Sequence, residues 1–273
     1  MLGAVVWISC GWVYRVHRMA FPAATSSYRI ALVALVAGVE ILAPGYEFGQ
    51  RENILLVAVF PYLFAAAAVA SGVSLPRALS LGIGVLAGVG FALKPYFLIL
   101  WLAIETWLWF RSRANSLRAE NVGIGAVLVG YTILVCVFSP EYFGMIELAL
   151  GVYSAYGVFG SPALLMHVSV ALVVGAAALV FFTTPGPLDR EIRIALVISA
   201  FSLLACALLQ GKGWDYHYDP AAAAATVLVG VILLGLGELF SRTWRGATRN
   251  VVMSIPLVLL LVLNTWGFAM LGQ

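Results

Sequence analysis

The sequence predicts an all-α, polytopic transmembrane helical bundle with about ten spans. Hydrophobic residues make up 63% of the 273-residue chain and charged residues only 10%, whereas a soluble domain carries about 25% charged residues. The hydrophobic residues fall in runs of roughly 16 to 22, close to the ~20 that a helix needs to cross the hydrocarbon core. Because lipid offers the backbone no hydrogen-bond partner, spans that are apolar on all sides are expected to be helices.

Charged residues, prolines and glycines mark the ends of these runs. They predict helices near 1–14, 28–43, 54–73, 78–93, 96–110, 122–138, 163–182, 194–209, 221–240 and 251–270. The first run lacks both a positively charged n-region and a cleavage site, so we expect the chain to begin inside a span rather than with a signal peptide. The connections are short, which predicts a single transmembrane domain over residues 1–273.

The positions of the basic residues predict how the bundle is oriented. If the chain enters from the outside, Arg51, Lys94 and Lys212 are the only outside residues among its fifteen lysines and arginines. Short inside loops of membrane proteins carry an excess of lysine and arginine, so this distribution favours that orientation. The three outside cations then need another reason to be there.

Several function classes are excluded or disfavoured by the same pattern. No basic stripe suits a nucleic acid, although the net charge is +3. Cys10, Cys136 and Cys206 lie inside apolar runs, where a thiol is usually a small hydrophobe, so we expect neither disulfides nor a metal site. The chain has no zinc spacing, phosphate loop or nucleophile elbow, and no cofactor is predicted.

The first outside segment, residues 44–53, combines acidic and basic side chains just before an apolar run. Glu47, Gln50, Arg51 and Glu52 lie at the mouth of the expected helix, where free N–H groups and the positive end of the dipole attract anions. The arginine fork suits phosphate oxygens. A simple helix cap with a surface ion pair explains this segment equally well.

Two further outside segments carry the other cations. Lys94 sits in a very short turn before Pro95, where a lysine that reaches the lipid headgroups is the simpler interpretation. The segment 210–220 (QGKGWDYHYDP) carries more polar and aromatic residues than a loop that only joins two helices needs. The aromatic belt of membrane proteins explains its tryptophan and tyrosines only in part. Its other polar groups favour a binding or catalytic role. The candidates there are Lys212, Trp214, Asp215, Tyr216 and His217.

The remaining polar features have competing interpretations. Residues 139–162 predict a short interfacial or re-entrant helix that forms either a lid or an ordinary surface element. Glu40 and Glu105 lie within expected spans, where a carboxylate is a functional candidate by default, although Glu40 is close enough to the outer end to reach water. His17 is expected on a solvated face, and His167 is expected to be a hydrogen-bonded core histidine.

Three of these segments, in their order and on one side of the membrane, resemble the GT-C class of polytopic glycosyltransferases. That class takes a sugar from a polyprenyl-phosphate donor and includes protein mannosyltransferases and aminoarabinose transferase. The similar stretches are residues 49–56 (GQRENILL), 90–95 (GFALKP) and 216–223 (YHYDPAAA). The family's first span and first outside loop have no counterpart before Met1, so we expect an N-terminally truncated member.

The resemblance implies sugar transfer to a glycan or lipid acceptor at the outer face of the bacterial cytoplasmic membrane. It implies Glu52, with Glu47 second, as the acidic catalytic group. It implies phosphate or substrate contacts for Gln50, Arg51, Lys94, Lys212, Trp214, Asp215, Tyr216 and His217. Two alternatives stay open: a transporter or flippase of a lipid-linked or small solute, which Glu105 favours, and a non-catalytic membrane subunit or fragment.

Overall fold

The computed structural model describes residues 2–115, 117–154, 157, 162–183 and 190–241, and every regular element in these ranges is helical. The helices are α1 (Leu2–Ala20), α2 (Ser26–Leu42), α3 (Arg51–Ala70), α4 (Arg77–Ala92), α5 (Leu98–Ser112), α6 (Ala119–Phe138), α7 (Glu141–Ser154), α8 (Val168–Phe182), α9 (Arg190–Gln210) and α10 (Asp215–Ser241). Single 3₁₀ turns, η1 (Gly45–Glu47), η2 (Pro95–Phe97) and η3 (Pro162–Leu164), lie in the connections.

The all-α prediction is therefore confirmed for the described residues. Each expected segment up to 221–240 corresponds to a helix, and the expected segment 251–270 lies outside the described residues. Helices α3, α6, α9 and α10 are long and apolar enough to cross a membrane, and α4 and α8 are shorter but also apolar. The chain thus has the helices of a membrane protein.

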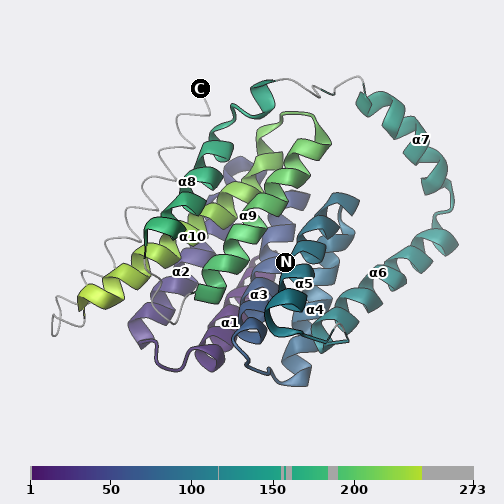
Figure 1. The fold of residues 1–273 in the computed structure, drawn as a ribbon. Coiled ribbons are helices and arrows are strands. Elements are labelled where there is room, and N and C mark those ends of the chain that lie inside the picture. Colours follow the sequence, from purple (N-terminus) through teal and green to yellow (C-terminus); the bar gives the residue numbers. More distant parts are fainter. Residues whose placement is uncertain (1, 116, 155–156, 158–161, 184–189, 242–273) are drawn as a thin grey trace.

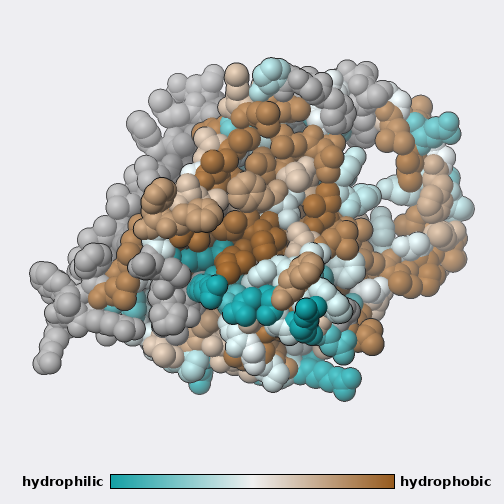
Figure 2. Space-filling model, viewed as in Figure 1, coloured by the Kyte–Doolittle hydropathy of each residue, from teal (hydrophilic) through white to brown (hydrophobic). Residues whose placement is uncertain are grey.

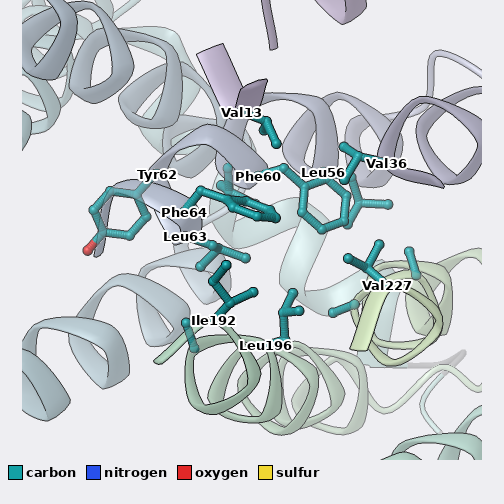
Figure 3. Packing of buried hydrophobic residues seen from close by; sticks show 14 of the residues in the cluster. Val13, Val36, Leu56, Phe60, Tyr62, Leu63, Phe64, Ile192, Leu196 and Val227 are labelled. Atoms are coloured by element: carbon teal, nitrogen blue, oxygen red, sulfur yellow. The ribbon is translucent and has the colours of Figure 1, made fainter. Parts of the chain in front are cut away.

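Helix α3 lies at the centre of the bundle, and mostly apolar side chains of the neighbouring helices surround it. It packs against α1, α2, α4, α5, α9 and α10. Figure 3 shows Phe60, Leu63 and Phe64 of α3 among side chains of the neighbouring helices, including Val13, Val36, Ile192, Leu196 and Val227. Because α3 is buried almost along its whole length, its first residues are held firmly at one end of the bundle.

Helices α4 and α6 cross closely at small residues. A β-carbon on Gly84 would lie 2.1 Å from the backbone oxygen of Glu120, and one on Gly123 would lie 2.8 Å from the backbone oxygen of Leu81. Only glycine allows two helix backbones to approach so closely, which is how small residues drive helix association in membranes. This crossing places the start of α6 beside the second and third turns of α4.

We name the two ends of the bundle after the predicted orientation. The outer end holds the first residues of α3 and α10 and the last residues of α4 and α9, and the inner end holds the opposite termini. In Figure 2 hydrophobic side chains cover much of the bundle, while hydrophilic ones gather in the lower part of the view. A largely hydrophobic surface of this kind suits a lipid environment.

Helix α7 lies apart from the bundle, beyond the end of α6 (Figure 1). It falls in the segment where a short interfacial helix was predicted. Its described side chains are exposed or nearly so, among them Phe143, Leu148 and Leu150. An exposed apolar helix of 14 residues is too short to cross a bilayer and suits its surface.

Candidate functional site

Four segments bring three predicted site residues and one further residue, Gln210, together at the outer end. The start of α3 supplies Glu52, the turn before α5 supplies Lys94, the end of α9 supplies Gln210, and the start of α10 supplies His217. All four side chains are buried. Residues far apart in the sequence thus form one polar cluster, which we call the outer cluster.

Glu52 is the central group of this cluster. It lies in the first turn of α3, where the helix dipole favours a carboxylate, and it is only 2% exposed. Its Oε1 accepts a hydrogen bond from Lys94 Nζ and lies 3.9 Å from His217 Nε2. Its Oε2 is buried and has no hydrogen-bond partner. One carboxylate oxygen is therefore left to accept a further donor.

Hydrogen-bond acceptors on α3 and α9 hold the side chain of Lys94 between these two helices. Its extended backbone, with φ −150°, precedes the 3₁₀ turn η2 that Pro95 begins. Besides the pair with Glu52, its Nζ donates to Oε1 of Gln210 over 2.8 Å. Burial lowers the pKa of Lys94, and the hydrogen bond from Lys94 to Glu52 opposes that shift. The expected lysine of the membrane interface is thus buried rather than reaching out to headgroups.

The connection between α9 and α10 takes its shape from two glycines. Gly211 and Gly213 have φ of 62° and 66°, a left-handed conformation that other residues rarely adopt. The loop between them places Lys212 Nζ 4.7 Å from the centre of the Trp214 ring. Partial burial lowers the pKa of Lys212, and repulsion from Lys94 and Arg51 lowers it further. The three outside cations therefore lie within electrostatic reach of one another.

Aromatic rings cover the cluster from the α10 side. His217 contacts the rings of both Trp214 and Tyr216, with centroids 5.4 and 4.4 Å away. The ring of Tyr216 is also 5.9 Å from Lys94 Nζ. His217 Nδ1 is buried without a hydrogen-bond partner. The site thus combines a carboxylate, cations and an aromatic wall.

The loop before α3 is anchored through Asn53, which bonds to the backbone of Glu40 in α2 and of Gly49. Asn53 Nδ2 donates to the backbone oxygen of Glu40 over 2.8 Å, and Asn53 Oδ1 accepts from the backbone of Gly49. The Glu40 carboxylate itself accepts from Ser9 Oγ over 2.8 Å and from Cys10 Sγ. Glu40 is completely buried, so it does not reach water, although its position near the outer end of α2 would have allowed this. Its carboxylate joins α2 to α1, and its backbone oxygen holds the loop.

A small cavity lies beside Glu52, between the loop before α3 and the start of α10. Its volume is about 10 Å³, which is room for about one water molecule. Glu47, Gln50, Glu52, Tyr216 and Asp219 are among the residues that line it. The cluster is thus nearly closed in this state of the protein.

The other predicted residues lie at different distances from the cluster. Gln50 caps α3 through its backbone and, like Arg51, has an exposed side chain. Asp215 is turned to another partner, because its Oδ1 lies 3.1 Å from Nε2 of His167. His167 also accepts from the backbone of Ser169 and stacks on Tyr218. The expected hydrogen bonds are present, but the side chain is 19% exposed and so does not lie in the core.

Sequence reasoning missed two members of the site. Gln210 is the last residue of a long apolar helix, and its only sequence signal is that it is the one amide in that helix. Asp219 lines the cavity from the second turn of α10, just before Pro220. It was visible in the loop sequence but no role was assigned to it.

Two further residues considered in the sequence, Glu105 and His17, lie outside the cluster. Glu105 accepts from Tyr62 over 2.7 Å, from Arg118 over 2.6 Å and from Asn121 over 2.7 Å. It therefore ties α3, α5 and α6 together as a fully bonded carboxylate. His17 is completely buried between Phe21 and Tyr28, so the prediction of a solvated face was wrong.

Among the described residues no group of three or more His, Cys, Asp or Glu side chains is arranged to hold a metal ion. Comparisons with protein-family models, with curated proteins and with solved structures found no match.

Proposed function

We propose that this protein transfers a sugar from a polyprenyl-phosphate donor to an acceptor hydroxyl at the outer face of a bacterial cytoplasmic membrane. The observation that carries the proposal is the outer cluster, in which a buried carboxylate with a free oxygen lies beside a group of cations. The resemblance to the GT-C class, in the same three segments that meet in the cluster, supports the same reaction.

The proposed reaction needs a base and a site for the leaving phosphate. Glu52 Oε2 accepts the proton of the acceptor hydroxyl, whose oxygen forms a bond to the anomeric carbon of the sugar. The bond between that carbon and the phosphate oxygen breaks, and its electron pair stays on the lipid phosphate. Lys94, Arg51 and Lys212 hold the resulting negative charge.

The pair between Lys94 and Glu52 suggests how the site responds to its donor. In the unbound protein Lys94 neutralises Glu52, and a buried pair is costly to separate unless a new partner replaces the old one. A donor phosphate supplies that partner for Lys94 and frees Glu52 to act as a base. Trp214 and Tyr216 offer rings for the sugar or for the first isoprene unit.

The transporter alternative loses its main support. It depended on Glu105 as a carboxylate inside a span, and transporters place such groups at the midplane on broken helices. Glu105 instead has three donors within 2.7 Å, which is the bonding of a structural group. A non-catalytic subunit remains the alternative that the activity test addresses.

The test is transfer of radiolabelled sugar from polyprenyl-phosphate donors to lipid and glycan acceptors, with the chain in membrane vesicles. We expect Glu52→Gln to lower the rate at least 100-fold, because loss of a general base costs 10²–10⁴-fold. Arg51→Ala is expected to weaken donor binding with a smaller change in the maximal rate. Glu147→Gln, an exposed carboxylate of α7, is the matched control. Equal activity of Glu52→Gln and the control would refute the proposal.

A further inference from the structure

Gln210 is the one member of the outer cluster that has neither a charge nor a ring. It is the last residue of α9, and only 8% of its surface is exposed. Its Oε1 accepts a hydrogen bond from Lys94 Nζ over 2.8 Å, and its Nε2 donates to the backbone oxygen of Cys206 over 3.2 Å. The reverse orientation of the amide would point N–H donors at the ammonium, so Lys94 fixes which way the amide lies.

The same face of α9 also holds the backbone of the turn that carries Lys94. Cys206 lies one helical turn before Gln210, and its Sγ donates to the backbone oxygen of Tyr96 over 3.0 Å. Tyr96 belongs to η2, which begins directly after Lys94. Helix α9 therefore holds both the turn, through Cys206, and the end of the lysine side chain, through Gln210.

Charged groups surround the ammonium of Lys94 on its other sides. Glu52 pairs with it from the start of α3, where Arg51 also lies. His217 of α10 is 3.9 Å from the Glu52 oxygen that accepts from Lys94, and Lys212 lies in the connection between α9 and α10. Burial lowers the pKa of Lys94, Glu52 raises it, and Arg51 lowers it. The amide adds an acceptor to this group without adding a charge.

A neutral acceptor suits a lysine that has to change partners. In the proposed reaction the donor phosphate replaces Glu52 as the partner of Lys94, and an ammonium held by Glu52 alone would then lose its position. A second carboxylate in place of Gln210 would compete with the phosphate for the ammonium. An apolar side chain there would leave Glu52 as the one acceptor of Lys94 among the described residues.

We propose that Gln210 is a positioning residue, which holds the ammonium of Lys94 beside Glu52 and keeps it in place when the phosphate arrives. The effect of Gln210 on catalysis rests on the proposed sugar transfer, whereas its hold on Lys94 does not. One experiment therefore measures the state of Lys94, and a second measures sugar transfer.

The first experiment follows the protonation of Lys94 in the full chain in nanodiscs. Competitive labelling with isotopic acetic anhydride across a pH series, read by mass spectrometry, gives the midpoint at which each lysine loses its proton. Gln210→Met keeps the length of the side chain but removes the acceptor, so we expect the Lys94 midpoint to fall by about one pH unit. Gln210→Glu keeps an acceptor and adds a negative charge, so we expect the midpoint to rise by about one pH unit.

Shifts in opposite directions distinguish positioning from packing, because a loss of packing would move both variants the same way. Ser199→Ala is the matched control. Ser199 is buried in α9 and, like Gln210, donates to a backbone oxygen one turn earlier, but it is not a partner of Lys94. Its removal should leave the Lys94 midpoint unchanged. In Gln210→Met the Lys212 midpoint is an internal reference and should change much less than that of Lys94.

The second experiment measures sugar transfer from polyprenyl-phosphate donors by the same variants in membrane vesicles. We expect Gln210→Met to lower the maximal rate about tenfold, because a misplaced Lys94 stabilises the leaving phosphate less. The KM for the donor should change less than the rate, since Arg51 and Lys212 still hold the phosphate. An unchanged rate in Gln210→Met would overturn the effect on catalysis.

The hold on Lys94 is overturned if its midpoint in Gln210→Met equals that in Ser199→Ala, or if both Gln210 variants shift it in the same direction. Thermal unfolding shows whether each variant is folded, and if Gln210→Met is not, the direction of the shift in Gln210→Glu decides. Opposite shifts in a chain that transfers no sugar from any donor would support the hold on Lys94 and refute the proposed function instead.

Discussion

The chemistry of the outer cluster depends on two amines in different surroundings. Lys94 and Lys212 are the only lysines of the chain. Burial is the main cause that lowers the pKa of each lysine. Lys94 is paired with Glu52 and nearly buried, whereas Lys212 is partly exposed above the Trp214 ring. Each amine can therefore be followed separately by chemical labelling.

We expect pH-dependent acetylation to reveal both shifted amines. Because only the neutral amine reacts, the rate rises with pH and levels off above the pKa, and both midpoints are expected below the ordinary lysine value of about 10.4. Lys212 should react faster than Lys94 because it is more accessible. The measurement is competitive labelling with isotopic acetic anhydride, read by mass spectrometry.

Glu52→Gln provides the control for the ion pair. Glu52 raises the pKa of Lys94, so its removal should lower the Lys94 midpoint further and increase labelling of Lys94 near neutral pH. The Lys212 midpoint should change much less. An unchanged Lys94 midpoint in this variant would show that the two side chains are not paired in solution.

At the scale of elements, glycine positions decide how closely α4 and α6 pack. Gly84 of α4 and Gly123 of α6 have no room for a β-carbon. A β-carbon on Gly125, also in α6, meets nothing within 4 Å. The glycines of α6 look alike in the sequence, but they differ in whether a side chain fits at their position. Only the neighbouring helix distinguishes them.

We expect Gly123→Ala to lower the free energy of unfolding by about 1–3 kcal/mol, because the added methyl group overpacks a backbone contact. Gly125→Ala should be neutral or stabilising by up to about 1 kcal/mol, since alanine favours the helix more than glycine. Thermal or denaturant unfolding in detergent measures both. If the two variants unfold alike, the α4–α6 crossing is not where the structure places it.

At the scale of the whole molecule, the outer cluster lies at one end of the helices and a second cavity at the other. This inner cavity has a volume of about 420 Å³, and Ser74, Arg77 and Arg118 are among the residues that line it. The outer cluster joins α3, α9 and α10, and the inner cavity joins α3, α4, α5 and α6. Helix α3 belongs to both and is buried along its length. If the bundle spans the membrane in the predicted orientation, the outer cluster and the inner cavity face different compartments.

Accessibility of introduced cysteines tests that orientation. With Cys136 replaced by serine and the other two cysteines buried, Gln50→Cys and Ser74→Cys each present one exposed thiol, at the outer and inner ends. In intact bacteria a membrane-impermeant maleimide should label Gln50→Cys and not Ser74→Cys. Labelling of both after the cells are opened is the control, and the reverse pattern in intact cells would invert the proposed topology.

Much of the outer cluster and of the cations near it could be predicted, because these residues stand out from their surroundings. Arg51, Lys94 and Lys212 were conspicuous as outside cations, and Glu52 and His217 lie next to two of those segments. Gln210 was not conspicuous, because a single amide at the end of an apolar helix looks like any helix terminus. The partner of Asp215 could not be predicted either, since His167 belongs to a different helix.

The sequence by itself determined that the chain is a bundle of apolar helices, because hydrophobic run length and the scarcity of charge leave no other way to satisfy the backbone in lipid. It also determined which ends carry the charges. Only the tertiary structure decided which charges meet. The pairing of Glu52 with Lys94, the bonding of Glu105 and the burial of His17 depend on how helices far apart in the chain pack side by side, and hydropathy along a single helix carries no record of its neighbours.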